Sequence, residues 1–416
     1  MHAESRPGGL SFPEPSPLAH HWLMQPGLVF LNHGSFGAMP RPVLEFQRRL
    51  QEEVLADPVG FIVEELEGRL DEARAVLAQF VGCDANDLAF VHNATSAVNT
   101  VVRSLSFSPG DELLTGNHEY NACNNALWMV AERVGAGVVI AEVPYPIREP
   151  EEVVRAILSK VTGRTKLALV SHVTSPTAAV FPIERIVAEL AARGVDTLVD
   201  GAHTPGMVEV DIDRLGAAYY TGNLHKWPSA PLGSAFLHVR RDRQKDIRPL
   251  VISHGANAAR PDRPLFRREF DYVASLDYTG WLSVPRALEF MGSLHPGGWP
   301  ELRRRNRELA LAMRRVLVES FGGTPPVPEE MIGSMATAWI PAHGPGEPRE
   351  SKYHDSLQDR LVHEYRVQAP IIPWVPTGEA ACGQRMARVS AQAYNTLGQA
   401  EYLAGAIKAA LSDVGD

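Results

Sequence analysis

Residues 165–200 read TKLALVSHVTSPTAAVFPIERIVAELAARGVDTLVD, and this stretch decides the fold class. Residues 165–173 and 195–200 are short apolar runs of the length that strands have, whereas residues 183–194 have the apolar spacing of a helix. A strand, a helix and a second strand in this order predict a unit whose two strands lie parallel in one sheet.

The same alternation continues on both sides of this unit. Further strands are expected at 87–92, 111–116, 137–144, 217–225 and 233–240, and further helices at 94–105, 121–135 and 151–161. Strands separated by helices of roughly 10–15 residues predict an α/β fold, with a mostly parallel sheet between two layers of helices. In such sheets the ligand binds beyond the carboxyl ends of the strands.

The remaining segments predict the domain organisation. Residues 1–27 are rich in Pro, Gly and Ser and are expected to form an N-terminal arm. Residues 28–285 are expected to form a large domain, whose helical stretch at 43–81 is divided by Pro58 and could also pack on the small domain. Residues 286–416 are expected to form a smaller α+β domain. Its predicted elements are a charged helix at 301–320, strands at 335–341 and 388–394, and a helix at 398–412.

The composition excludes several classes of function. A net charge of −9 without a basic stripe argues against nucleic acid or an anionic membrane as partner. The three cysteines, Cys83, Cys123 and Cys382, lack CxxC spacing, so neither a disulfide scaffold nor a metal site is expected. The first residues lack the basic start and apolar stretch of a secretory signal, so none is expected, and no apolar run of about 18 residues that could cross a membrane is present. These features predict a soluble, cytoplasmic protein.

Polar residues follow the predicted strand ends. HNATSAVN at 92–99 leads into a helix, where the N–H groups, Thr95 and Ser96 could bind a phosphate or only cap the helix. No glycine-rich dinucleotide fingerprint or P-loop is present. TGNHEYNA at 115–122 places His118 or Tyr120 at the same edge of the sheet, where a flat ring can stack on a flat ligand.

Two further motifs carry ionisable groups. In LVDGAHTPG, Asp200 ends an apolar strand, where a carboxylate is costly unless it faces a cation or hydrogen-bond donors; a capping role is the alternative. His203 adds a hydrogen-bonding group three residues later. In TGNLHKWP, apolar neighbours surround Lys226, and burial would lower its pKa and make it an amine nucleophile. A phosphate site, a stacking ring, an aspartate for a ring nitrogen and a lysine for an aldehyde predict pyridoxal 5′-phosphate (PLP) as cofactor.

Six motifs occur in order between residues 31 and 396: LNHGSFGAMPRPV, NATSAVNTV, HEYNA, VDGAHTPG, TGNLHKW and RVSAQAYNT. With them the sequence resembles the class V aminotransferase family of PLP-dependent enzymes. Its likeness within this family is to the isopenicillin N epimerase branch, which also contains C–S lyases of the ergothioneine type. The resemblance covers nearly the whole chain. It implies the fold type I of PLP-dependent transferases and a homodimer whose active site is shared between the subunits.

The resemblance also implies roles for individual residues. Lys226 forms the Schiff base with the cofactor, and Asp200 binds the pyridinium nitrogen. The other implied cofactor-binding residues are Thr95, Ser96, Asn223 and His225 around the phosphate, His203 and Thr174 at the phenolic oxygen, Thr279 from the second subunit, and His118 on the ring, with Tyr120 as the alternative. The implied substrate-binding residues are Arg388 at the α-carboxylate and Asn32 and His33 at the entrance. The resemblance does not identify the acid on the opposite face, for which Tyr278 is the candidate.

The expected reaction begins when Lys226 removes the Cα proton of an amino acid. The resemblance favours epimerisation; β-elimination by a C–S lyase and transamination are the alternatives, and a non-catalytic PLP-binding protein is the rival from another class. Related cysteine desulfurases carry a persulfide on a loop cysteine upstream of the arginine. The corresponding stretch here, APIIPWVPTG at 369–378, has no cysteine, and Cys382 lies only six residues before Arg388. Sulfur transfer through a protein persulfide is therefore not expected, and Cys382 is expected to be a packing residue.

Overall fold

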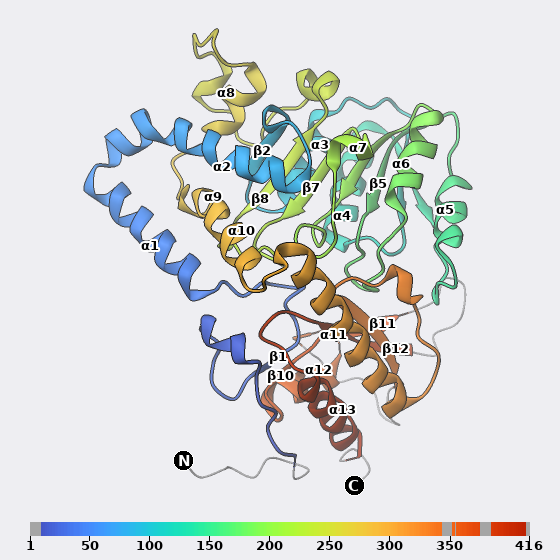
Figure 1. Cartoon of the computed structure of the whole chain (residues 1–416). Helices are drawn as coiled ribbons and strands as arrows, with labels where there is room; N and C mark the ends of the chain where they lie inside the picture. Colours follow the sequence, from blue (N-terminus) through green and yellow to red (C-terminus); the bar gives the residue numbers. More distant parts are fainter. Residues whose placement is uncertain (1–9, 343–351, 354, 375–383, 413–416) are drawn as a thin grey trace.

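A seven-stranded sheet forms the centre of the molecule (Figure 1), as seen in a computed structural model that describes residues 10–342, 352–353, 355–374 and 384–412. The strand order is β2-β8-β7-β6-β5-β3-β4, and every neighbouring pair is parallel except those that β8 makes. The strands are β2 (Leu88–Val91), β3 (Glu112–Gly116), β4 (Gly137–Ala141), β5 (Thr165–Ser171), β6 (Asp196–Asp200), β7 (Tyr219–Asn223) and β8 (Ala235–Val239). The predicted α/β fold with a mostly parallel sheet is confirmed.

The apolar strands are explained by helices on both faces of the sheet. Along β5, Leu167 and Leu169 face one core, while Ala168 and Val170 face the other. Both sides of such a strand are buried, which is why its sequence is apolar without alternation. The helices around the sheet are α3 (Ala94–Ser104), α4 (Asn121–Val134), α5 (Pro150–Leu158), α6 (Ile183–Ala192), α7 (Ile212–Leu215) and α8 (Leu265–Asp271).

The N-terminal helical stretch is interrupted where the sequence predicts. Helix α1 (Arg41–Ala56) ends just before Pro58, a π-helical segment (η3, Gly60–Glu65) follows, and α2 (Leu66–Val81) continues to Gly82. Gly82 has a φ of +67°, a left-handed backbone conformation that favours glycine at a helix end. Helix α1 packs against α9 and α10 of the following segment.

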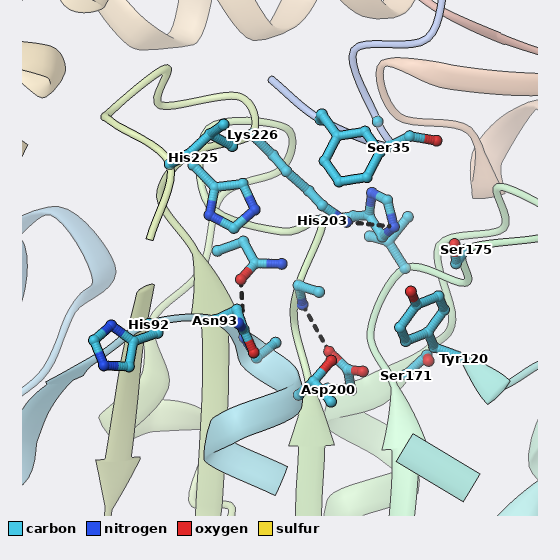
Figure 2. A pocket seen from close by; sticks show the side chains of 18 of the residues that line it. Ser35, His92, Asn93, Tyr120, Ser171, Ser175, Asp200, His203, His225 and Lys226 are labelled. Atoms are coloured by element: carbon cyan, nitrogen blue, oxygen red, sulfur yellow. Dashed lines mark hydrogen bonds between the residues drawn. The ribbon is translucent and has the colours of Figure 1, made fainter. Parts of the chain in front are cut away.

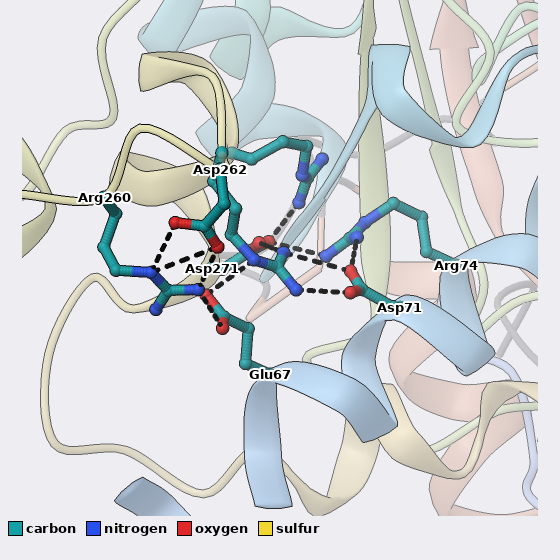
Figure 3. A network of polar contacts seen from close by, with 8 residues as sticks. Glu67, Asp71, Arg74, Arg260, Asp262 and Asp271 are labelled. Atoms are coloured by element: carbon teal, nitrogen blue, oxygen red, sulfur yellow. Dashed lines mark hydrogen bonds and ion pairs between the residues drawn. The ribbon is translucent and has the colours of Figure 1, made fainter. Parts of the chain in front are cut away.

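A buried ion-pair network ties α8 to α2 (Figure 3). Asp271 accepts hydrogen bonds from Arg74 at 2.6 Å and from Arg263 at 3.2 Å. Arg263 also pairs with Asp71 and Glu67 of α2. Arg267 is also nearly inaccessible to solvent, and its ion pair among the described residues is with Asp271, so loss of Asp271 would leave the charge of Arg267 buried and uncompensated. The network therefore fixes α8 and the start of the segment that leads to Tyr278.

The C-terminal part contains a separate antiparallel sheet in the order β11-β12-β9, on which the long helix α11 packs. A second, two-stranded sheet joins β1 to β10. The elements are β1 (Val29–Phe30), α9 (Thr279–Leu282), α10 (Val284–Ser293), α11 (Gly298–Phe321), β9 (Met335–Ile340), α12 (Ser356–His363), β10 (Val367–Gln368), β11 (Ile371–Trp374), β12 (Gln384–Ser390) and α13 (Leu397–Ser412). Short 3₁₀ helices are η2 (Pro17–His21), η4 (Ala85–Asp87), η5 (Arg241–Asp246), η6 (His254–Ala256) and η7 (Glu329–Met331).

Two sequence expectations need adjustment. The strand predicted at 388–394 ends at Ser390, because the Gln392 N–H donates to the Asn395 side chain and the chain turns there. Strand β1 lies within the predicted large domain, yet it pairs with β10 of the C-terminal part. The domain boundaries themselves stay a prediction. Among the described residues, no helix combines the length and apolarity needed to cross a membrane.

Candidate active site

A cavity of about 450 Å³ lies at the carboxyl ends of the central strands (Figure 2). Its walls come from the segments that follow β2, β3, β5, β6 and β7, from residues 232–233 before β8, and from the loop 34–36. The parallel sheet thus brings together residues that are far apart in the sequence. Of the predicted site residues, Thr95, Tyr120, Asp200, His203, Asn223, His225 and Lys226 line this cavity.

Lys226 is the amine of the cavity. It follows β7, it is 8% exposed, and its Nζ lies 3.1 Å from Nε2 of His203. The pKa of Lys226 is lowered to about 7, mainly by burial; the negative charge of Asp200 opposes this shift, and the positive charge of Arg388 adds to it. Burial also lowers the pKa of His203 well below its ordinary value, so this ring is neutral. The Nδ1 atom of His203 has no hydrogen-bond partner among the described residues.

Asp200 lies at the carboxyl end of β6 and is 3% exposed. Its Oδ1 accepts the N–H of Ala202 at 2.9 Å, and its Oδ2 accepts the thiol of Cys123 at 3.3 Å. Asp200 thus accepts a local backbone N–H and also lines the cavity; the role expected for it stays a prediction. A buried carboxylate with one donor on each oxygen keeps lone pairs for a further donor.

The N-terminus of α3 also faces the cavity. Asn93 caps this helix by accepting the N–H of Ser96 at 2.8 Å, so capping is present, but by Asn93. The Ala94 N–H donates to the side chain of Asn223 at 2.9 Å, and Thr95 lines the cavity. Ser96 does not line it, because its hydroxyl donates back to Asn93 at 3.1 Å. The helix N-terminus and Asn223 together are suited to an anion.

The structure favours Tyr120 over His118 as the ring at the cavity. Tyr120 lines the cavity and is 49% exposed. His118 is fully buried elsewhere: its Nδ1 lies 2.9 Å from the Thr177 hydroxyl, its Nε2 lies 3.2 Å from the Val143 carbonyl, and its ring packs edge-on against Trp374. The expectation that His118 projects into the crevice is therefore wrong, because apolar packing and two hydrogen bonds hold it away.

Arg388 lies on β12 and approaches the cavity from the C-terminal part. Its guanidinium donates to the Asn32 side chain at 3.2 Å, to the Ser35 hydroxyl at 2.9 Å and to the Ser175 carbonyl. Ser35 and Ser175 line the cavity, whereas Arg388 and Asn32 lie behind them. Burial lowers the pKa of Arg388 to about 10, so it remains positive at neutral pH. Asn32 thus orients Arg388 instead of lining the entrance.

His33 contacts the backbone of Lys226 and does not line the cavity. It is fully buried, with Nε2 3.0 Å from the Lys226 carbonyl and Nδ1 2.8 Å from the Tyr394 hydroxyl. Burial lowers the pKa of His33 to about 4, so its ring is neutral. His33 therefore fixes the backbone at Lys226, and it does not line the entrance as the sequence suggested.

Three other expected residues do not reach the cavity of this chain. Thr174 is buried and shares a hydrogen bond with Thr177 at 2.7 Å, although its neighbours Val173 and Ser175 line the cavity. Tyr278 is 2% exposed and donates to the Ala274 carbonyl at 2.7 Å, so it is not the opposite-face acid. Thr279 is buried and bonds to Asp277; its role in a second subunit stays a prediction. Cys382 lies outside the described residues.

Sequence reasoning missed several cavity residues. His92, Asn93, Ser171, Ser35 and Phe36 all line it. Asn93 and Ser171 stand at strand ends, and the rule that located Asp200 could have found them. Ser35 and Phe36 come from a loop outside the sheet and gave no such signal. No group of three or more His, Cys, Asp or Glu side chains in the described part of the chain could hold a metal ion.

Comparison with known proteins identifies the family. Residues 55–262 match the family described as Aminotransferase class-V. The chain belongs to the class V aminotransferase family. It is 32% identical over 401 residues to isopenicillin N epimerase of Streptomyces clavuligerus, covering 93% of this chain and 96% of that protein. It is 31% identical over 425 residues to putative L-cysteine desulfhydrase 1 of Oryza sativa subsp. japonica, covering 95% and 85%.

A solved structure supports the fold. It is a lysine-to-alanine variant of C-DES with glycine covalently linked to the PLP cofactor. The two chains share a TM-score of 0.78 and 18% sequence identity, with 94% of this chain and 99% of the other covered. The predicted fold type I and the predicted family are confirmed. This class V aminotransferase family member is a PLP-dependent enzyme.

The donor set of the cavity fits PLP. A buried amine whose pKa is lowered to about 7 suits the aldehyde, and the oriented carboxylate of Asp200 suits a protonated ring nitrogen. The N-terminus of α3 suits the phosphate, and the exposed ring of Tyr120 suits the flat face of the pyridine. The unpartnered Nδ1 of His203 leaves one more hydrogen-bonding position beside the lysine.

Proposed function

We propose that this enzyme removes the Cα proton of an amino-acid substrate with Lys226 as the base, and that epimerisation is the outcome. The observation that carries the proposal is the state of Lys226, a buried amine in the cavity wall with a pKa lowered to about 7. A group with such a pKa is both unprotonated and basic enough near neutral pH to accept a proton and to return it.

The cavity residues are assigned to three parts of the cofactor: the ring nitrogen, the face of the ring and the phosphate. Asp200 binds the ring nitrogen, and Tyr120 stacks on the ring. Thr95, Asn223 and His225 bind the phosphate beside the N-terminus of α3. When bound, PLP supplies an electron sink that takes up the charge left at Cα. These assignments extend the sequence prediction, with Tyr120 in place of His118.

Arg388 binds the α-carboxylate of the substrate. Asn32, Ser35 and the Ser175 carbonyl hold its guanidinium in one orientation directly behind the cavity lining formed by Ser35 and Ser175. A planar guanidinium can give two parallel hydrogen bonds to a carboxylate, which fixes the substrate as well as attracting it. The carboxylate position in turn decides which substituent of Cα points toward Lys226.

Proton transfer at Cα then depends on a base, on the residue that orients the base, and on a proton donor. Lys226 takes the Cα proton at Nζ, and His203 at 3.1 Å orients that atom. Epimerisation also needs a proton donor on the other face of Cα. Since Tyr278 is bonded elsewhere, we assign this role to the hydroxyl of Tyr120, the half-exposed phenol that lines the cavity.

β-Elimination is the second candidate function. The 31% identity to a putative L-cysteine desulfhydrase over 95% of the chain supports it nearly as well as the identity to isopenicillin N epimerase supports epimerisation. Elimination would use the same proton removal by Lys226, followed by loss of the β-substituent, and it needs no donor on the opposite face. Transamination would instead return the proton away from Cα.

Product analysis separates these outcomes. Purified holoenzyme is incubated with isopenicillin N, L-cysteine and a panel of L-amino acids, with Lys226→Ala as control. Chiral chromatography detects an inverted product, sulfide and pyruvate detect elimination, and a keto acid detects transamination. Inversion of one substrate supports epimerisation; sulfide without inversion replaces it by the lyase. No reaction of any substrate in the panel would contradict the proposal.

We also propose that the enzyme acts as a homodimer with Thr279 reaching the partner's site. An exposed apolar strip on α1 and η3, formed by Leu55, Val59 and Val63 at 78%, 71% and 74% exposure, supports an interface there. Light scattering of purified protein tests the dimer, and a monomer at micromolar concentration would refute it. A cytoplasmic location stays a prediction from the composition.

A further inference from the structure

Cys123 contacts Asp200 and takes no part in the mechanism above. Cys123 lies in the first turn of α4, is fully buried, and donates its thiol to Oδ2 of Asp200 at 3.3 Å. Since Oδ1 takes the Ala202 N–H at 2.9 Å, each carboxylate oxygen has one donor from a different element. Two such donors fix the plane of the carboxylate.

The cysteine acts here as a donor and not as a nucleophile. Burial, and then the negative charge of Asp200, raise the pKa of the Cys123 thiol well above its ordinary value. The thiol therefore keeps its proton at every working pH. A protonated thiol beside a carboxylate can only donate, which gives Cys123 a defined role toward Asp200.

We propose that Cys123 is a positioning residue for Asp200, and that its thiol fixes the orientation of the carboxylate. The ring nitrogen of bound PLP would then meet an oriented carboxylate. This inference rests on the role proposed above for Asp200.

The thiol is tested by PLP titration of the apo-protein. Cys123→Ala should bind PLP about tenfold more weakly, because one donor to a charged group is lost, and should shift the pH midpoint of the bound cofactor's absorption. Cys123→Ser, which keeps a donor, should lie within about twofold of wild type, with an unchanged midpoint. Cys83→Ala serves as the control, since the thiol that donates to Asp200 is that of Cys123 and not that of Cys83.

Two outcomes would overturn the role of Cys123: wild-type affinity and midpoint in Cys123→Ala, or equal defects in the alanine and serine variants, which would show that only packing matters. Asp200→Asn separates this failure from that of the proposed function. If Asp200→Asn changes both readouts and Cys123→Ala changes neither, only the inference fails. If Asp200→Asn leaves both unchanged, the assigned role of Asp200 fails as well.

Discussion

Replacing Lys226 by methionine should stabilise the apo-protein while it abolishes turnover. The pKa of the buried amine is lowered from 10.5 to about 7, so the folded state binds this proton less well than the unfolded chain. At pH 7 this difference costs the wild type about 4 kcal/mol of folding free energy, since one pKa unit corresponds to about 1.4 kcal/mol. Methionine has a similar shape and no charge to desolvate.

The sign of the pH dependence follows from the depressed pKa. The stability associated with Lys226 is fully present above pH 10.5 and is lost as the pH falls to about 7. At pH 9 the cost to the wild type is therefore only about 2 kcal/mol. The advantage of Lys226→Met in the free energy of unfolding should shrink by about 2 kcal/mol between pH 7 and pH 9.

Urea unfolding of the apo-proteins at the two pH values, followed by tryptophan fluorescence, measures this difference. Lys160→Met serves as the control, because Lys160 is exposed and its charge is already hydrated. Its difference from wild type should be the same at both pH values. An advantage of Lys226→Met that is absent, or that does not change between pH 7 and pH 9, would refute a buried amine with a lowered pKa.

Further substitutions test the other assignments. Tyr120→Ala should weaken PLP binding about tenfold in an affinity titration. Tyr120→Phe should keep the PLP affinity, but its rate of epimerisation should fall by at least about a hundredfold. His118→Ala should lower the melting temperature without changing the PLP affinity. Arg388→Lys should raise KM for the amino acid about a hundredfold with unchanged PLP binding; an unchanged KM would exclude Arg388 from carboxylate binding. Asp271→Ala should cost about 3–5 kcal/mol of stability in urea unfolding, since it leaves the buried Arg267 without its ion-pair partner.

The fold could be predicted because its signals are local. The apolar run at 165–173 predicts one strand, and the helical spacing at 183–194 predicts one helix. Because the crossover between two parallel strands is short and right-handed, the helix can pack on the sheet in few ways. The ends of the strands then place Asp200 and Lys226 at one edge. That conclusion needs only the order of the elements, and the cavity lies at this edge.

The errors concern residues whose direction depends on distant partners. His118 and Tyr120 are two residues apart, and which of them faces the cavity depends on the packing of His118 against Trp374 from the C-terminal sheet. His33 was expected at the entrance, yet it lies between Tyr394 and the Lys226 carbonyl, 361 and 193 residues away along the chain. Contacts of this range leave no periodic trace in the sequence.

The central claim, that Lys226 removes the Cα proton, is tested most directly by hydrogen exchange at Cα. Holoenzyme and Lys226→Ala are incubated in deuterium oxide with each turned-over amino acid, and recovered substrate and product are analysed by mass spectrometry and proton NMR. The account predicts deuterium at Cα with the wild type, at a rate that rises with pH up to about 7 as the amine loses its proton, and no exchange above background with Lys226→Ala. Exchange at the wild-type rate in Lys226→Ala would contradict it.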